Sequence, residues 1–161
     1  MKELCERLVS LLKEKGLTLS CAESCTGGLI SKSITDVSGC SSVFYGGVVS
    51  YDNSVKERIL GVKSDTLLTY GAVSYQTAME MAQGVKLALN TDIGISTTGI
   101  AGPGGGTPEK PVGTVFLGFS YKGITESVLL SIDSSLSRDE IRHSALYQIL
   151  TLLYNKIGES Y

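Results

Sequence analysis

A run of small residues at positions 22–28 carries the side chains in this sequence that are best suited to chemistry. It follows an apolar, β-prone stretch and precedes a helix-compatible one, so we expect a strand to run directly into a helix. The free backbone N–H groups of such a junction lie at the positive end of the helix dipole and favour an anion or a developing oxyanion. Donors near Thr26, Gly27 and Gly28 would therefore meet a substrate beside the hydroxyls of Ser24 and Thr26.

A serine nucleophile needs a base, and the usual base is histidine. The one histidine, His143, falls at the edge of the polar face of a predicted helix, and a G-x-S-x-G motif is absent. Glu23 would point to the opposite face of its strand from Ser24. Lys56 is a better candidate, because partial burial at a helix start lowers the pKa of an amine, and Tyr51 could complete a proton relay. Taken singly, helix capping, a solvated lysine and sheet packing remain the simpler explanations.

Two arginines lie on the apolar stripe of the final predicted helix. Ser137 and Glu140 have capping-box spacing and open this helix. At ~100° per residue, Arg138 and Arg142 fall within its apolar face and should point inward. A guanidinium there needs a carboxylate, a carbonyl or a phosphate as its partner. The carboxylates available for a structural ion pair are Asp36, Asp133 and Asp139.

A glycine-rich loop at residues 99–106 directly follows a predicted strand at 92–98. It does not match the Walker pattern G-x-x-x-x-G-K-[ST]. The loop is either a flexible turn between two strands or backbone that lies against a flat or phosphorylated ligand. In the second case, the candidate contacts are Thr98, Gly99, Gly102, Gly104 and Gly105.

Apolar periodicity predicts helices that alternate with strands along the whole chain. Helices are expected at 2–15, from 29 to about 36, near 53–60, from 64, from 74, and from 137 to about 157. Strands are expected at 17–21, 42–52, 92–98, 113–121 and 124–132, the last two joined in a tight hairpin. This order predicts a single α/β domain over residues 1–161, with three α/β/α layers and a mixed, mostly parallel sheet.

Two local signals sharpen these boundaries. Ser54 and Glu57 have capping-box spacing, which places a helix start near Asn53. The pair Gly46 and Gly47 inside the second strand indicates a bulge or a close backbone approach.

The composition excludes several function classes. The 161 residues are 42% hydrophobic and 19% charged with a net charge of −2, which suits a globular domain and gives no basic footprint for nucleic acid. No apolar run reaches the ~20 residues of a membrane span, and the first residues lack the apolar core of a signal peptide, so we expect a cytoplasmic protein.

The four cysteines match no C-x-x-C pattern, and a single histidine offers little further soft ligation. We therefore expect reduced, mostly buried thiols and no metal site. The sequence calls for no organic cofactor.

Taken together, these segments resemble the CinA C-terminal domain family, whose stand-alone members are nicotinamide-nucleotide amidohydrolases. The resemblance spans nearly the whole chain in order. It rests on A-E-S-C-T-G-G at 22–28, G-V-V-S-Y-D-N at 47–53 with Lys56, G-A-V-S at 71–74, T-G-I-A-G-P-G-G at 98–105 and K-P-V-G-T-V at 110–115.

The resemblance implies hydrolysis of the carboxamide of nicotinamide mononucleotide to nicotinic acid mononucleotide and ammonia, a metal-independent step of pyridine nucleotide salvage. It puts the nucleophile on Ser24, the base on Lys56 and an accompanying tyrosine on Tyr51. It adds Asn53 to the substrate-binding candidates, and matches an R-x-x-x-R pair to Arg138 and Arg142, although Leu136-Ser137 replace the usual glycine-acid pair before them. A small-molecule nucleotide is the expected partner, and a homodimer is what the family leads us to expect.

Two alternatives remain at this point. The chain could be a non-catalytic nucleotide-binding or regulatory module on the same scaffold, or an amidase for another pyridine carboxamide. The larger relatives carry a separate N-terminal domain that has no counterpart in these residues, so none of that domain's functions is assigned to this chain.

Overall fold

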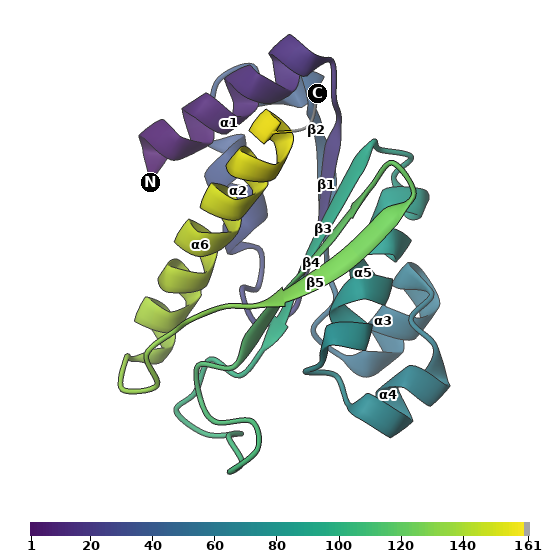
Figure 1. Ribbon diagram of the computed structural model, residues 1–161, viewed down its shortest axis with the longest axis vertical. Helices are drawn as coiled ribbons and strands as arrows, with labels where there is room; N and C mark the ends of the chain where they lie inside the picture. Colours follow the sequence, from purple (N-terminus) through teal and green to yellow (C-terminus); the bar gives the residue numbers. More distant parts are fainter. Residues whose placement is uncertain (160–161) are drawn as a thin grey trace.

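The computed structural model describes residues 1–159, which form a five-stranded sheet between two layers of helices (Figure 1). Helices α1, α2 and α6 cover one face, and α3, α4 and α5 cover the other. The helices are α1 Lys2–Lys15, α2 Leu29–Thr35, α3 Asn53–Leu60, α4 Ser64–Tyr70, α5 Tyr75–Ala88 and α6 Arg138–Glu159. The strands are β1 Leu19–Glu23, β2 Phe44–Val49, β3 Ile93–Gly99, β4 Val115–Tyr121 and β5 Ile124–Leu129. The predicted α/β class and three-layer order are confirmed.

The strand order β2-β1-β3-β4-β5 puts the chain's first strand inside the sheet and its second at an edge. β1 pairs in parallel with β2 and with β3, whereas β4 runs antiparallel to β3 and to β5. Four strands therefore point the same way and β4 opposes them. The carboxyl ends of β1, β2 and β3 meet at one edge, where an open α/β sheet usually places its ligands.

Gly46 and Gly47 in β2 produce the bulge and the close backbone approach that their position predicts. The register between β1 and β2 shifts after Leu19, which pairs with Phe44 while Ser20 pairs with Gly46. A Cβ on Gly47 would lie 2.4 Å from the Ser31 Oγ. The bulge and the close approach are both present, and the second lets α2 lie against this edge strand.

Two element boundaries differ from the predictions. The second strand is shorter than residues 42–52, because a 3-10 turn at Cys40–Ser42 precedes it. Helix α3 is capped by Asp52, whose carboxylate accepts from the Ser54 N–H at 2.9 Å, so the predicted Ser54 capping box is wrong. Aspartate caps as well as serine and stands closer to the helix start.

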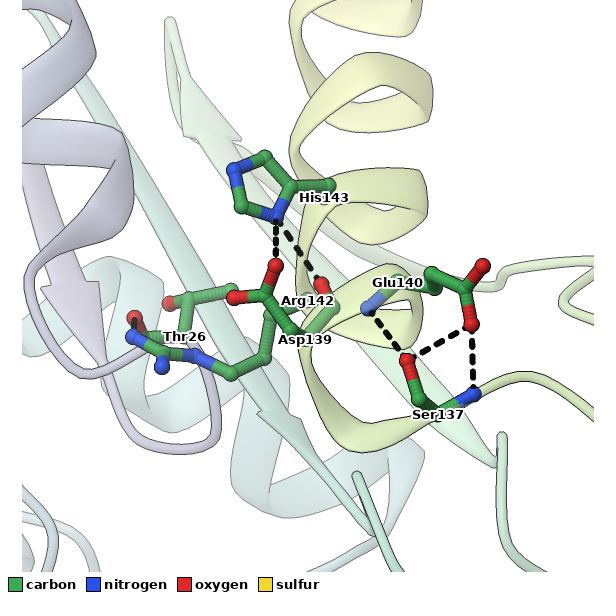
Figure 2. Close-up of polar contacts among 6 residues, drawn as sticks. All are labelled: Thr26, Ser137, Asp139, Glu140, Arg142 and His143. Atoms are coloured by element: carbon green, nitrogen blue, oxygen red, sulfur yellow. Dashed lines mark hydrogen bonds and ion pairs between the residues drawn. The ribbon is translucent and has the colours of Figure 1, made fainter.

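The predicted cap of α6 is confirmed. The Ser137 hydroxyl and N–H both donate to the Glu140 carboxylate, at 2.6 and 2.8 Å (Figure 2). This capping box holds the start of α6, where Arg138 and Arg142 lie one turn apart.

The hydrophobic core is divided by the sheet. The larger part, which includes Leu8, Ile30 and Ile149, lies under α1, α2 and α6, and a smaller cluster around Met81 and Val85 lies under α3 and α5. All four cysteines are free thiols, three of them buried. Within residues 1–159, no helix combines the length and apolarity needed to cross a bilayer.

Helix α5 packs unusually close to its neighbours, because glycines face it. Cβ atoms on Gly94 and Gly118 would lie 2.1 Å from the carbonyl oxygens of Ala82 and Ala78, respectively. Within α5, a Cβ on Gly84 would lie 1.8 Å from the Leu60 carbonyl oxygen at the end of α3. Backbone contacts backbone on this face, which fixes α3 relative to the sheet.

We predict that Gly84→Ala lowers the free energy of unfolding by about 2 kcal/mol, because α3 must move away to admit the methyl group. Helix propensity alone predicts the opposite sign, a gain of up to about 1 kcal/mol. Gly158→Ala in α6 is the matched control, since its Cβ would meet nothing within 4 Å. Urea unfolding of both variants measures the difference, and equal effects would contradict this packing argument.

Candidate active site

Ser24 and Lys56 meet at the carboxyl edge of the sheet. Ser24 directly follows β1, and Lys56 lies in the first half of α3. The Lys56 Nζ donates to the Ser24 Oγ at 3.1 Å. Only 1% of Lys56 and 9% of Ser24 are exposed. A hydroxyl and an amine that are 32 residues apart in sequence thus form a buried pair.

The pairing of β1 with β2 explains this meeting. The chain leaves β2 beside the end of β1, and the Ser50 N–H donates to the Glu23 carbonyl oxygen at 2.8 Å. The chain then turns through the Asp52 cap into α3, which directs the Lys56 side chain back toward the sheet. Its Nζ also donates to the carbonyl oxygens of Ser50 at 2.7 Å and Tyr51 at 3.2 Å.

Burial lowers the pKa of the Lys56 amine, since a desolvated ammonium is disfavoured, while the nearby charge of Asp52 raises it in part. A neutral amine keeps two N–H donors and one lone pair. The carbonyls of Ser50 and Tyr51 match the two donors, which leaves the lone pair for the Ser24 hydroxyl. The geometry therefore suits proton transfer from Ser24 to Lys56.

The start of α2 is occupied by the chain's own carboxylate. Glu23 is fully buried, and its Oε2 accepts from the N–H groups of Gly28 at 3.1 Å and Ile30 at 3.0 Å. The Gly27 N–H donates to the Ser24 carbonyl oxygen at 3.1 Å. The expectation that Gly27 and Gly28 offer N–H groups to an oxyanion is therefore wrong: both groups are already bonded within the turn.

The Tyr51 hydroxyl faces away from the amine that it was expected to serve. Tyr51 is 61% exposed, and its hydroxyl accepts from the Arg138 Nη2 at 2.8 Å. Tyr51 contacts the Lys56 Nζ through its carbonyl oxygen instead. The predicted proton relay through the Tyr51 hydroxyl is not what the structure shows, because the phenol belongs to the arginine side of the site.

The two arginines bind carbonyl groups. The Arg138 Nη1 donates to the Gly102 carbonyl oxygen at 2.7 Å, which ties the glycine-rich loop to α6. The Arg142 Nη2 donates to the Thr26 carbonyl oxygen at 2.7 Å (Figure 2). Arg142 is half-buried and its Nε has no partner among the described residues. Arg138 is exposed, so the prediction that both arginines point inward fails for the first of them.

The carboxylates proposed as structural partners of these arginines are engaged elsewhere. Asp139 pairs with His143 at 3.3 Å along α6, and both side chains are exposed (Figure 2). Asp36 pairs with Lys32, and Asp133 accepts from Ser135. Neither guanidinium group, that of Arg142 at the turn after Ser24 or that of Arg138 at the glycine-rich loop, has a neutralising carboxylate among residues 1–159.

The remaining candidates spread over the same edge without contacting the pair. Thr98 is buried, and its hydroxyl donates to the Ala72 carbonyl oxygen at 2.6 Å, which connects β3 to the loop before α5. Gly99 ends β3, where a Cβ would collide with the Thr114 carbonyl oxygen at 2.6 Å. Asn53, Gly104 and Gly105 are exposed.

Residues 1–157 match the CinA C-terminal domain family. The chain belongs to this family. A relative from Thermoanaerobacter sp. (strain X514), named as a competence-damage inducible protein, is 62% identical over 139 residues, which are 85% of this chain and 34% of the relative. A CinA-like protein of Leptospira interrogans (serovar copenhageni) is 53% identical over 155 residues, 94% of this chain and 36% of the relative. The chain thus spans about a third of the length of these relatives.

A solved structure supports the same assignment. The competence/damage inducible protein CihA from Agrobacterium tumefaciens is 40% identical, has a TM-score of 0.93, and is matched over 98% of this chain and 95% of its own. The two chains therefore share one fold, including the sheet whose carboxyl edge carries Ser24 and Lys56 in this protein.

Sequence reasoning overlooked two residues of this CinA domain. Glu23 was considered only as a base, although a charged residue that ends an apolar strand just before a helix is a signal for an internal helix partner. Ser50 supplies the carbonyl oxygen nearest to the Lys56 Nζ, and its own hydroxyl is buried without a partner among the described residues. A backbone acceptor leaves no trace in a sequence pattern.

The lowered pKa of Lys56 makes a prediction about stability. In the pH range between its folded pKa and its ordinary value of 10.5, the unfolded chain binds more protons than the folded one, so stability rises with pH there. Lys56→Met removes this contribution. The free energy of unfolding of the unmodified domain, minus that of Lys56→Met, should therefore increase as the pH rises from 7 to about 10.

Urea unfolding of both proteins at several pH values measures this difference. Lys2→Met, at an exposed position, is the control and should show no such trend. If the difference in unfolding free energy between the unmodified domain and Lys56→Met stays constant or decreases with pH, the lowered pKa of Lys56 is contradicted.

Proposed function

We propose that this CinA domain hydrolyses the carboxamide of nicotinamide mononucleotide to nicotinic acid mononucleotide and ammonia, through an acyl-enzyme on Ser24. The observation that carries the proposal is the buried contact of the Lys56 Nζ with the Ser24 Oγ at 3.1 Å. A desolvated amine with a lowered pKa is the kind of base that activates a serine in the absence of histidine.

In the first half of the reaction, Lys56 takes the hydroxyl proton and the Ser24 oxygen bonds to the carboxamide carbon. The C–N bond of the tetrahedral intermediate then breaks, Lys56 returns the proton to nitrogen, and ammonia leaves. In the second half, water gives a proton to Lys56 and attacks the acyl carbon, and the Ser24 oxygen departs with that proton. Every proton thus passes through one amine.

The oxyanion needs donors other than Gly27 and Gly28. We assign it to the backbone N–H groups of Cys25 and Thr26, since the N–H that follows a nucleophile serves this role in other serine hydrolases. The Thr26 N–H has no hydrogen-bond partner among residues 1–159. One such donor typically contributes about 3 kcal/mol to barrier lowering.

The nucleotide's phosphate is assigned to the arginine side of the site. Arg138 and Arg142 each use part of a guanidinium on carbonyl oxygens, and their remaining N–H groups suit a bidentate anion. Gly102, Gly104 and Gly105 in the adjoining loop, with Asn53, Thr98 and Gly99, would border the ribose and the ring. Tyr51 orients Arg138 in this arrangement.

We predict that Ser24→Ala and Lys56→Met each lower ammonia release from nicotinamide mononucleotide by about 10³-fold or more, since they remove the nucleophile and the base. Ser33→Ala is the matched control: its hydroxyl bonds within α2 at 2.7 Å and does not touch the pair. Circular dichroism verifies the fold of each variant. A folded Ser24→Ala that keeps full activity would reject the nucleophile.

A panel of amides decides between this function and its alternatives. The proposal expects ammonia from nicotinamide mononucleotide and much less from nicotinamide. Ammonia from an unphosphorylated pyridine carboxamide only would indicate a different amidase. Binding of the nucleotide without ammonia release would indicate a non-catalytic module.

Arg138→Ala should raise the KM for nicotinamide mononucleotide about tenfold and leave the KM for nicotinamide riboside nearly unchanged, because a charge-assisted hydrogen bond to phosphate is lost. Arg58→Ala, an exposed arginine on α3, is the control. Initial-rate kinetics on both substrates measure the split. Equal effects on the two substrates would make Arg138 a purely structural residue.

A further inference from the structure

Glu23 has an environment that neither catalysis nor core packing accounts for. It ends β1 next to Ser24 and is fully buried. Its carboxylate accepts from six donors among the described residues: Thr26 Oγ1 at 2.7 Å, Gly28 N at 3.1 Å, Ile30 N at 3.0 Å, Ser31 N at 2.8 Å, Ser31 Oγ at 2.7 Å and Cys21 Sγ at 3.6 Å. None of these six donors is a cationic side chain.

The donors lie on both sides of the nucleophile. Cys21 precedes Ser24 on the strand, while Thr26 and Gly28 belong to the turn that follows it. The Thr26 hydroxyl also bonds to the Thr97 hydroxyl of β3 at 2.8 Å. Because one rigid group binds the chain before and after Ser24, it restricts the position of the serine oxygen.

The backbone of Glu23 reaches the base as well. Its carbonyl oxygen accepts from the Ser50 N–H at 2.8 Å, and the Ser50 carbonyl oxygen accepts from the Lys56 Nζ at 2.7 Å. Residue 23 therefore contacts the turn that carries the nucleophile and the segment that holds the base. Strand alternation keeps its side chain away from the Ser24 oxygen, so it has no direct access to the reacting atoms.

We propose that Glu23 is a positioning residue: its carboxylate binds six donors from β1, from the turn after Ser24 and from the start of α2, and so holds the serine oxygen and the Thr26 N–H in the positions that the reaction needs. This inference rests on the proposed function for the identity of the nucleophile. It differs from a general stabilising role because it predicts a loss in kcat with little change in KM. A misplacement of about 1 Å at a nucleophile is enough for a 10²-fold loss.

Glu23→Gln tests the proposal, because it keeps the shape and turns one acceptor into a donor that faces donors. We expect kcat for nicotinamide mononucleotide to fall about 10²-fold while KM changes less than about threefold. Glu80→Gln is the matched control: that carboxylate on α5 also accepts from a backbone N–H, of Lys63 at 2.8 Å, and a hydroxyl, of Thr66 at 2.7 Å, and it bonds to neither Ser24 nor Lys56. It should lose stability alone.

A second readout does not need the amide reaction. A fluorophosphonate phosphorylates an activated serine with loss of fluoride, and mass spectrometry locates the adduct. Glu23→Gln should label at Ser24 at least tenfold more slowly than the unmodified domain, and Glu80→Gln at the unmodified rate. If no amide is hydrolysed but this difference in labelling holds, the proposed substrate fails and the positioning role stands. If the unmodified domain is not labelled at Ser24, both fail.

Glu23→Ala with added formate gives the last test, since formate returns a carboxylate to the space that the substitution opens. Labelling and kcat should recover in a saturable way with formate and should not respond to equal chloride. A folded Glu23→Gln with unchanged kcat and labelling would overturn the proposal. So would failure of Glu23→Gln, Glu23→Asp and formate-treated Glu23→Ala to fold, because the carboxylate would then serve folding as a whole.

Discussion

The site depends on one costly placement, a lysine amine that is almost entirely removed from water. Burying an ammonium is unfavourable unless acceptors replace the lost hydration. The carbonyls of Ser50 and Tyr51 supply that replacement, and the Asp52 carboxylate at the start of α3 offsets part of the penalty. The desolvation that destabilises the folded state is also what lowers the pKa of Lys56, so the loss of stability and the basic character of the amine have the same cause.

Charges at the sheet edge are kept in separate places. The Glu23 carboxylate lies beneath the turn, surrounded by neutral donors, and the guanidinium groups of Arg138 and Arg142 lie outside it on carbonyl oxygens. If these groups paired with one another, neither the turn nor an incoming anion would have a partner. The backbone of the turn after Ser24 separates them. It contacts the Glu23 carboxylate on its inner side, and the arginines on its outer side keep N–H groups for an incoming anion.

Much of this was accessible from the sequence, and the failures have physical reasons. Apolar periodicity located the helices and strands, and the family resemblance named Ser24 and Lys56 together, two side chains that the structure brings into contact at 3.1 Å. Tyr51 was misjudged because spacing cannot tell whether a side chain or its carbonyl faces a neighbour. Gly28 was misjudged because a free N–H was assumed where Glu23, five residues earlier, already bonded it. The predicted cap of α3 was wrong because Asp52 and Ser54, two residues apart, are both good capping residues and the structure uses Asp52.

Ser24 and Lys56 follow strands that have different numbers of neighbours in the sheet. Ser24 continues β1, which has a strand on each side, whereas Lys56 lies in α3, the helix that follows β2, and β2 is an edge strand with β1 as its one neighbour in the sheet. Fraying of an edge costs far less free energy than global unfolding. The backbone contact between Leu60 and Gly84 attaches α3 to α5 as well, so the position of Lys56 beside Ser24 does not depend on the edge strand alone.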